Sequence, residues 1–314
     1  MTDHRPSSTL KPRFSGIFAA LATPFSHRRV DEAGLKGNVR ALIRAGLHGF
    51  VALGSSGEFP HLSWDEKLSV VSAVLEEAGP AGVPVLAQTG CLTTDETLRL
   101  SLKVAELGVQ GVLVVTPFYY RPRMTRSALL RHYRAVADEC PVPVLLYNMP
   151  ALTGVNLEPP LVAELALHPN IAGLKDSSAN LVQFLDYLRL APPGFAAFMG
   201  SGSLILPALA LGAAGVIAAV PQVAPRACLD IYRAVAAGDL ARARELQVRL
   251  EPTVQATGAR FGIPGLKAAL NLVGLAGGEV RPPLLDLEPS EVAEVRAALR
   301  ELGLLAEERR PETE

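Results

Sequence analysis

The sequence predicts a (β/α)8 barrel, the TIM-barrel class of α/β folds, followed by a C-terminal helical extension. From Gly16 onward, eight short apolar runs alternate with amphipathic segments, and short connections join them. The chain has 314 residues, 49% of them hydrophobic, which is enough for one barrel domain and an extension. A doubly wound sheet is the main rival. Such sheets usually have fewer strands and a glycine-rich phosphate loop near the first turn, which this chain lacks.

The eight apolar runs are short and nearly continuous, as expected for parallel strands that are buried on both faces. The expected strands are residues 16–24, 48–55, 84–90, 111–117, 142–150, 170–178, 195–202 and 215–220.

The amphipathic segments between the runs are the expected barrel helices: residues 31–45, 63–77, 93–107, 125–139, 159–167, 181–190, 203–211 and 222–237. Ser63 and Thr93 are each followed three residues later by a glutamate, the pattern of a capping box at a helix start. Glycines follow several segments and indicate helix ends: Gly46, Gly79, Gly108 and Gly212.

The pattern divides the chain into three parts. Residues 1–13 are polar and are expected to be a disordered leader, and residues 14–237 form the barrel. Residues 238–314 hold three further helical patterns, at 240–258, 263–275 and 289–304, which exceed what the barrel needs. They predict a small helical extension with a charged, frayed tail.

Composition excludes several classes of function. The net charge is −1 and aromatic residues are few, so neither nucleic acid nor an anionic membrane surface is an expected partner. The three cysteines, Cys91, Cys140 and Cys228, are far apart, which suits a reducing cytoplasm and gives no zinc or disulfide pattern. Because the first 13 residues are polar, we expect them not to be a signal peptide. The sequence holds no apolar run long enough to span a bilayer and no metal or nucleotide motif. We therefore expect chemistry by side chains alone, without cofactor or metal.

One expected strand ends on a lysine. Residues 171–174 carry no polar side chain, and Lys175 follows them directly. A lysine held in a cavity loses part of its charge, becomes a nucleophile, and forms an imine with a ketone or aldehyde. Taken alone, the stretch favours a simpler interpretation, in which Lys175 marks the solvent end of a core strand, because structural lysines are much commoner.

The strand ends supply possible partners for this lysine. In such a barrel the active site lies at the C-terminal ends of the strands. Serines of the turn at 54–58, tyrosines at 119, 120 and 147, and the glycine-flanked Ser201 all fall there. Each has an ordinary structural explanation singly. Together they supply an imine-forming lysine, a phenol to carry protons, and a glycine-rich turn whose N–H groups can bind a carboxylate. The set fits imine chemistry on a 2-oxo acid.

The chain resembles the dihydrodipicolinate synthase / N-acetylneuraminate lyase family of pyruvate-dependent class I aldolases. The resemblance covers residues 14–304 and rests on strings that are specific in combination: those at 54–58, 115–120, 146–150, 153–154 and 173–178. Within the family the chain looks most like 4-hydroxy-2-oxoglutarate aldolases. The strings at 57–60, 119–121, 168–171 and above all 260–267 carry that finer resemblance.

The resemblance implies catalytic roles residue by residue. Lys175 would form the Schiff base, and Tyr147 would be the general acid and base. Ser55 takes the position of the hydroxyl in the family's proton relay. Tyr119 takes that of the relay tyrosine, which the neighbouring subunit of a tight dimer contributes. The resemblance also implies a homotetramer built from two such dimers.

It implies binding residues as well. Ser55, Ser56 and Gly57 would hold the pyruvate carboxylate in the turn. Dihydrodipicolinate synthases have an arginine, which holds the carboxylate of aspartate semialdehyde, where this chain has Leu152. Leucine cannot bind a carboxylate, so the lysine-biosynthesis reaction is disfavoured. The hydroxyoxoglutarate branch usually has asparagine at this position and at Ser56, so the distal carboxylate lacks an obvious partner. Arg121 and Ser201 are the candidates.

The sequence therefore predicts a Schiff-base aldolase that cleaves a 4-hydroxy-2-oxo acid, with 4-hydroxy-2-oxoglutarate as the preferred substrate, into pyruvate and an aldehyde such as glyoxylate. The alternatives are a synthase that condenses pyruvate with an aldehyde, including dihydrodipicolinate synthase, and a sugar-acid aldolase or dehydratase. A non-catalytic barrel that binds small acids is a further alternative, although a binder needs neither nucleophile nor relay. A pyridoxal phosphate barrel lacks a clear phosphate loop.

Overall fold

The computed structural model describes residues 13–306, and within them eight parallel strands form a closed barrel. The barrel strands are β1 (Gly16–Ala20), β4 (Gly49–Ala52), β5 (Val85–Gln88), β6 (Gly111–Val115), β7 (Val144–Asn148), β8 (Ile171–Asp176), β9 (Ala196–Met199) and β10 (Gly215–Ala218). Their spatial order is β1-β10-β9-β8-β7-β6-β5-β4, and β4 pairs with β1 to close the ring. Each strand lies inside one predicted run and is shorter, because the runs also contained loop residues.

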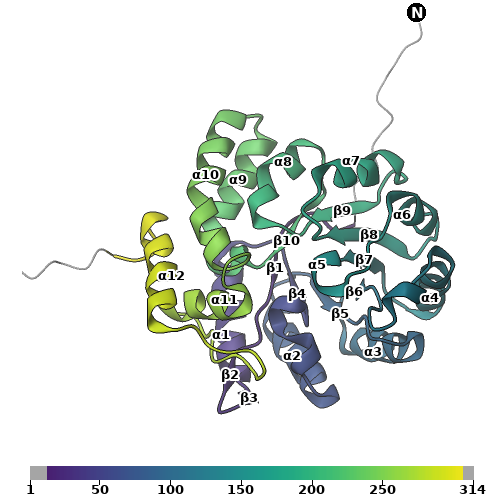
Figure 1. Ribbon diagram of the computed structural model, residues 1–314, viewed down its shortest axis with the longest axis horizontal. Coiled ribbons are helices and arrows are strands. Elements are labelled where there is room, and N and C mark those ends of the chain that lie inside the picture. The colour runs from purple at the N-terminus through teal and green to yellow at the C-terminus, as the bar shows by residue number, and fades with distance from the viewer. Residues whose placement is uncertain (1–12, 307–314) are drawn as a thin grey trace, which may run out of the picture.

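Helices surround the strands (Figure 1). The barrel helices are α1 (Glu32–Ala45), α2 (Trp64–Ala78), α3 (Thr94–Leu107), α4 (Arg126–Glu139), α6 (Pro159–Leu165), α7 (Leu181–Leu190), α8 (Ile205–Ala210) and α9 (Pro225–Ala236). The predicted (β/α)8 barrel is confirmed. Two helices begin later than expected: a 3-10 turn (Gly202–Leu204) precedes α8, and Pro225 occupies the first turn of α9, where its missing N–H costs nothing.

Two short strands and one short α-helix were not predicted. β2 (Phe25–Ser26) and β3 (Arg29–Val30) form a small antiparallel hairpin after β1. Helix α5 (Pro150–Thr153) follows β7 directly and ends at Gly154, whose φ of 65° lies in the left-handed region. Elements of two to four residues give no periodicity, so the sequence pattern could not reveal them.

Helix ends follow the predicted signals at most positions. Ser63 and Glu66 form a reciprocal capping box at the start of α2, and Thr93 accepts the N–H of Glu96 at the start of α3. Gly46 ends α1 in the left-handed conformation that favours glycine. Gly79 differs from the prediction, because its φ of −59° continues the helical geometry.

Alternate side chains of the strands divide the core into two layers. The inner cluster takes residues from β1, β4, β5, β6, β7, β9 and β10, and it includes Leu145 and Tyr147. Their neighbours Val144 and Leu146 belong to the larger cluster between the strands and the helices. Because side chains alternate along a strand, the inner cluster fills the barrel. Tyr147 lies in the layer of this cluster that is nearest the C-terminal ends of the strands.

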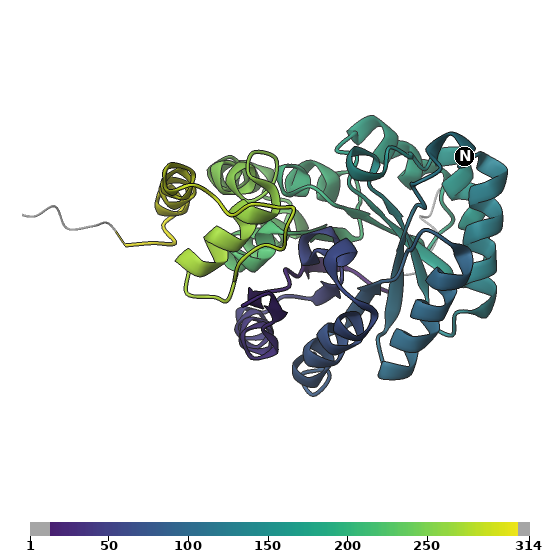
Figure 2. The same cartoon turned by 60° about the horizontal axis from the view of Figure 1, so that its bottom comes forward.

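The extension contains α10 (Leu240–Ala256), α11 (Gly262–Leu272) and α12 (Pro289–Glu301), as predicted. These helices share a small apolar core with Ala22 and Val223 of the barrel. Figure 2 shows α11 and α12 beside the barrel, on the side of α1. The division at residue 237 stays a prediction. Most of the expected leader (1–12) and of the charged tail (307–314) lie outside the described residues.

Candidate active site

Lys175 and Tyr147 occupy paired positions on adjacent strands, β8 and β7. Both side chains are buried, with 4% and 2% of the residue exposed. The Nζ atom of Lys175 lies 4.2 Å from the centroid of the Tyr147 ring. Tyr147 belongs to the inner cluster, so the lysine also lies inside the barrel near the C-terminal ends of its strands. The structure thus removes the reading of Lys175 as a solvent-exposed strand end.

Ser55 completes a cluster of three polar groups, because its Oγ lies 3.3 Å from the Tyr147 hydroxyl. Burial raises the pKa of Tyr147. The positive charge of Lys175 and hydrogen bonds with Ser55, Lys175 and Ser177 outweigh that effect, so the pKa of Tyr147 is lower than that of a free tyrosine. A phenol with a lowered pKa gives up its proton more readily near neutral pH, which suits a general acid and base.

Replacing Ser55 with alanine removes one of the hydrogen bonds that lower the pKa of Tyr147. We expect kcat/KM to fall about 10-fold, the size of one lost hydrogen bond of this kind, and the rise of kcat/KM with pH to move to higher pH. Steady-state rates measured between pH 6 and pH 10 check this. Thr125→Ala, which removes a surface helix cap, is the control and leaves the profile unchanged. An S55A profile equal to that of the wild type contradicts the assignment.

The turn that carries Ser55 has an unusual backbone. A 3-10 turn (Ser55–Gly57) follows β4. Leu53, two residues before the turn, has a φ of 62°. Thr23 donates its hydroxyl to the Gly57 carbonyl at 2.8 Å. Ser55 and Ser56 begin the turn, so their N–H groups have no acceptor within it. Two serines with free N–H groups can bind a carboxylate.

The other predicted residues lie farther out. Leu152 is in α5 and 66% exposed, and Ser201 is partly buried in the loop after β9. Tyr119 is 72% exposed, and its ring packs edge-on against Tyr120 with the centroids 5.1 Å apart. Within residues 13–306, Tyr119 makes no hydrogen bond with Ser55 or Tyr147, so one chain does not assemble the expected relay by itself. Its role across a subunit interface stays a prediction.

Sequence reasoning missed a buried network behind the site. Asn148 donates to the Asp176 carboxylate at 2.8 Å, and the Ser178 hydroxyl donates to its second oxygen at 2.8 Å. Burial raises the pKa of Asp176, although these hydrogen bonds oppose the shift. Asn148 and Asp176 each follow a site residue in their strand, so they point to the helix side. The alternation of side chains along the strand was the available signal. It also places Ser177, two residues after Lys175, on the side of the site, where it forms a hydrogen bond with Tyr147.

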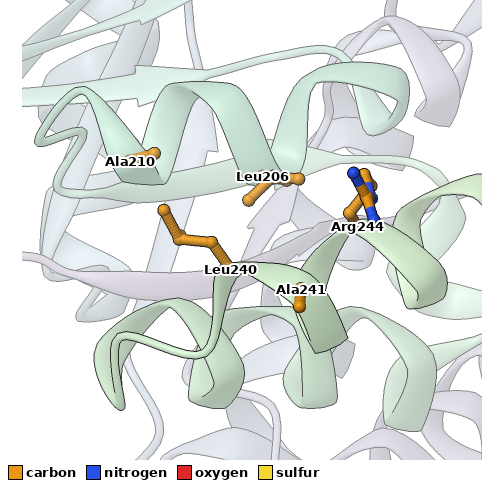
Figure 3. A pocket seen from close by; sticks show the side chains of 5 residues that line it. All are labelled: Leu206, Ala210, Leu240, Ala241 and Arg244. Atoms are coloured by element: carbon orange, nitrogen blue, oxygen red, sulfur yellow. The ribbon is translucent and has the colours of Figure 1, made fainter.

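A separate surface hollow lies away from these residues. It has a volume of about 480 Å³ and lies between α8 and α10, where Leu206, Ala210, Leu240, Ala241 and Arg244 line it (Figure 3). Its walls are apolar except for the arginine, and none of the predicted site residues belongs to it. Residues 13–306 contain no group of three or more metal-ligating side chains, and no helix among them is long and apolar enough to cross a bilayer.

Comparison with known proteins identifies the family. The model of the dihydrodipicolinate synthetase family matches residues 13–302. The chain belongs to this family. A protein of Methanospirillum hungatei named 4-hydroxy-tetrahydrodipicolinate synthase is 40% identical over 275 residues, which cover 86% of this chain and 93% of that protein. A protein of Methanosphaerula palustris with the same name is 40% identical over 293 residues, 92% of this chain and 98% of that protein.

Solved structures agree with the family assignment. Dihydrodipicolinate synthase from Thermotoga maritima superposes with a TM-score of 0.88 at 32% identity, covering 93% of this chain and 99% of that one. A family member from an E. coli K12 prophage, solved in complex with pyruvate, has a TM-score of 0.87 at 30% identity, with coverage of 93% and 100%. Membership makes this chain a pyruvate-dependent lyase, as predicted. The relatives' names favour the synthases over the 4-hydroxy-2-oxoglutarate aldolases that the finer motifs indicated.

Proposed function

We propose that the enzyme condenses pyruvate with an aldehyde through a Schiff base on Lys175. The observation that carries this proposal is the buried Lys175 at 4.2 Å from the ring of Tyr147, inside a barrel. The synthase names of the relatives support the direction of the reaction. A binding protein has no use for a buried nucleophile beside a phenol of lowered pKa.

The first half of the reaction activates pyruvate. The Nζ atom of Lys175 attacks the C2 ketone, and Tyr147 delivers the proton with which the former ketone oxygen leaves as water. The resulting iminium withdraws electrons from C3, so the Tyr147 phenolate left by the previous step accepts a C3 proton and an enamine forms. The pyruvate carboxylate would rest on the N–H and hydroxyl groups of Ser55 and Ser56, which fixes the ketone beside Lys175.

The second half makes the new bond. C3 of the enamine attacks the aldehyde carbon, a carbon–carbon bond forms, and the aldehyde oxygen takes a proton from Tyr147. Ser55, at 3.3 Å from the phenol, is placed to return that proton. Water then adds to the iminium and expels the product, which regenerates the free amine of Lys175.

The same steps in reverse cleave a 4-hydroxy-2-oxo acid, and this is the second candidate. Leu152 favours it over the reaction with aspartate semialdehyde, because an exposed leucine stands where the resemblance places a carboxylate-binding arginine. The strings at 119–121 and 260–267 point to 4-hydroxy-2-oxoglutarate as the substrate, with pyruvate and glyoxylate as products. A sugar acid is compatible with the same site.

Arg121 is the cation that we propose for a second substrate carboxylate. It lies against the end of α5, since a methyl group at Gly154 would be 2.7 Å from its Nη1 atom. Leu152 is two residues before that glycine. Among the described residues no carboxylate forms an ion pair with Arg121, so its charge is available to a ligand.

Parallel assays decide between the two reactions. One measures consumption of pyruvate with aspartate semialdehyde, and the other measures pyruvate release from 4-hydroxy-2-oxoglutarate. We expect pyruvate to be consumed with aspartate semialdehyde, but slowly, because Leu152 supplies no charge for the carboxylate of this aldehyde. The ratio of the two kcat/KM values assigns the preferred aldehyde. Absence of both activities, under conditions where pyruvate is bound, would contradict the proposal.

Replacing Leu152 with arginine should increase activity with aspartate semialdehyde. A charge-assisted hydrogen bond to a carboxylate contributes about 1.5–3 kcal/mol, which corresponds to a 10- to 100-fold rise in kcat/KM. Leu152→Met is the matched control and should change little, because it adds no charge. An L152R variant no better than L152M shows that this position does not face the aldehyde.

We also propose that the active enzyme is a homotetramer of two tight dimers. The exposed ring of Tyr119 supports this, because the relay described above lacks its second tyrosine within one chain. Light scattering of the purified enzyme tests the assembly, and a monomeric active enzyme excludes it.

A further inference from the structure

A buried ion pair joins the helical extension to the turn that carries Ser55. The Nζ atom of Lys267, in α11, lies 2.5 Å from an Oε1 atom of Glu58, the residue that follows the turn. The two side chains are only 1% and 0% exposed. Removing two charges from water is costly, so a buried pair of this kind is weak evidence for stability alone. Its location suggests a different purpose.

Both members of the pair also have contacts beyond each other. The second carboxylate oxygen of Glu58 lies 3.0 Å from Nδ1 of His61 and accepts the N–H of Arg281 at 3.1 Å. Lys267 donates to the Glu279 carbonyl at 2.6 Å and lies 4.2 Å from the centre of the Phe25 ring. Lys267 and Arg281 of the extension, together with His61, therefore hold the Glu58 carboxylate.

The backbone between Leu53 and Glu58 needs such a restraint. Both residues have positive φ values, 62° and 56°, in a region of backbone conformation that residues other than glycine rarely adopt. Strained conformations of this type persist only where the surroundings fix them, and they gather at functional sites. Between them lie the two serines whose N–H groups would bind the pyruvate carboxylate. The Thr23 hydroxyl holds the Gly57 carbonyl, and the ion pair holds the next residue.

We propose that Glu58 and Lys267 are positioning residues, which fix the 55–57 turn in the geometry that binds the substrate's carboxylate. The extension then contributes to substrate binding without contacting substrate. This inference rests on the proposed function, because it takes the turn as the pyruvate site. It predicts a specific defect on removal of the pair: weaker pyruvate binding, with the chemistry at Lys175 largely intact.

The test uses the double variant Glu58→Gln/Lys267→Met in the full-length enzyme. Both charges are removed together by groups of similar size, a change that buried pairs often tolerate without loss of stability. We expect the melting temperature to stay near that of the wild type, the KM for pyruvate to rise at least about 10-fold, and kcat to change less than about 3-fold. An unchanged KM overturns the proposal, as does a loss confined to kcat.

A control variant separates positioning from simple docking of the extension. Asn38 is buried in α1 and makes two hydrogen bonds of 2.8 Å with the backbone of Ala276 in the extension. Neither residue belongs to the 55–57 turn. Asn38→Ala should lower the melting temperature and leave the KM for pyruvate unchanged. If it raises KM as much as the double variant does, the extension acts only through general stability and the proposal is wrong.

Borohydride trapping at varied pyruvate concentrations separates this inference from the proposed function. Wild-type enzyme that forms no adduct at Lys175 fails the proposed function itself. Where the wild type does form the adduct, the double variant should need at least about 10-fold more pyruvate for half-maximal trapping. Equal half-maximal concentrations in the two enzymes refute the positioning role and leave the proposed function standing.

Discussion

Replacing Lys175 with arginine is expected to lower kcat/KM by at least about 10⁴-fold. Arginine keeps the positive charge, but its guanidinium stays protonated and cannot attack a ketone, so no iminium forms. Loss of a covalent nucleophile removes the whole reaction path rather than one interaction, which is why so large an effect is expected. Continuous assays of pyruvate consumption, with protein concentration raised to detect residual turnover, measure the loss.

A surface lysine supplies the control for this variant. Lys103 lies in α3, pairs with Glu106, and has a side chain that is 48% exposed. Lys103→Arg keeps the charge and should retain wild-type kinetics. Circular dichroism and melting temperature verify that K175R is folded. A folded K175R enzyme with more than a few per cent of wild-type activity contradicts a Schiff-base mechanism at this position.

Replacing Tyr147 with phenylalanine should lower kcat by about 10² to 10⁴-fold, the usual contribution of a general acid and base. The phenyl ring keeps the packing against Lys175 and the inner cluster, so pyruvate should still form an adduct, although slowly. Steady-state kinetics combined with the rate of borohydride trapping measure both effects. Trapping that is lost entirely would show that the phenol is needed for imine formation itself.

The lowered pKa of Tyr147 also predicts how kcat/KM changes with pH. The pKa of Tyr147 lies below that of an ordinary tyrosine, near 10, so the phenolate forms at lower pH than in a free side chain. Where Tyr147 acts as a base, kcat/KM should rise with pH and level off once the pH exceeds this lowered pKa. The rise should be absent in Y147F. A rise centred at or above pH 10 in the wild type excludes Tyr147 as the titrating group.

Another buried tyrosine tests whether the loss of any buried hydroxyl would lower kcat as much as Tyr147→Phe is expected to. Tyr133 is fully buried in α4, and its hydroxyl donates to the Val114 carbonyl at 3.2 Å, outside the inner cluster. Burial raises the pKa of Tyr133, in contrast to the lowered pKa of Tyr147. Tyr133→Phe should therefore lower stability slightly and leave kcat unchanged. A comparable loss of kcat in Y133F would point to a packing defect in both.

The barrel was predictable because its pattern is long and regular. Parallel strands buried on both faces leave continuous apolar runs, and amphipathic helices with capping residues such as Ser63 separate them. The sequence did not predict the hairpin β2–β3 or helix α5, because elements of two to four residues are too short to show a repeating pattern. α8 was predicted too long for another reason, since a 3-10 turn before it continues the helical pattern of residues.

Part of the site was also predictable, because it follows from the geometry of the barrel. Strand ends in a barrel converge, so Lys175, Tyr147 and Ser55 could be expected together, and the structure places them within one cluster. The Glu58–Lys267 pair could not be found that way, because it joins a turn to a helix more than two hundred residues later. Nothing in the local pattern around Lys267 distinguishes it from a solvated lysine. Only the packing of the extension on the barrel does so.

Reduction of the pyruvate adduct tests the central claim most directly. The enzyme is incubated with pyruvate and sodium borohydride, digested, and mapped by mass spectrometry. We predict a reduced pyruvyl group on the peptide that contains Lys175, absent without pyruvate and absent in K175R. An enzyme that turns over pyruvate yet carries no adduct, or carries it on another lysine, contradicts the mechanism.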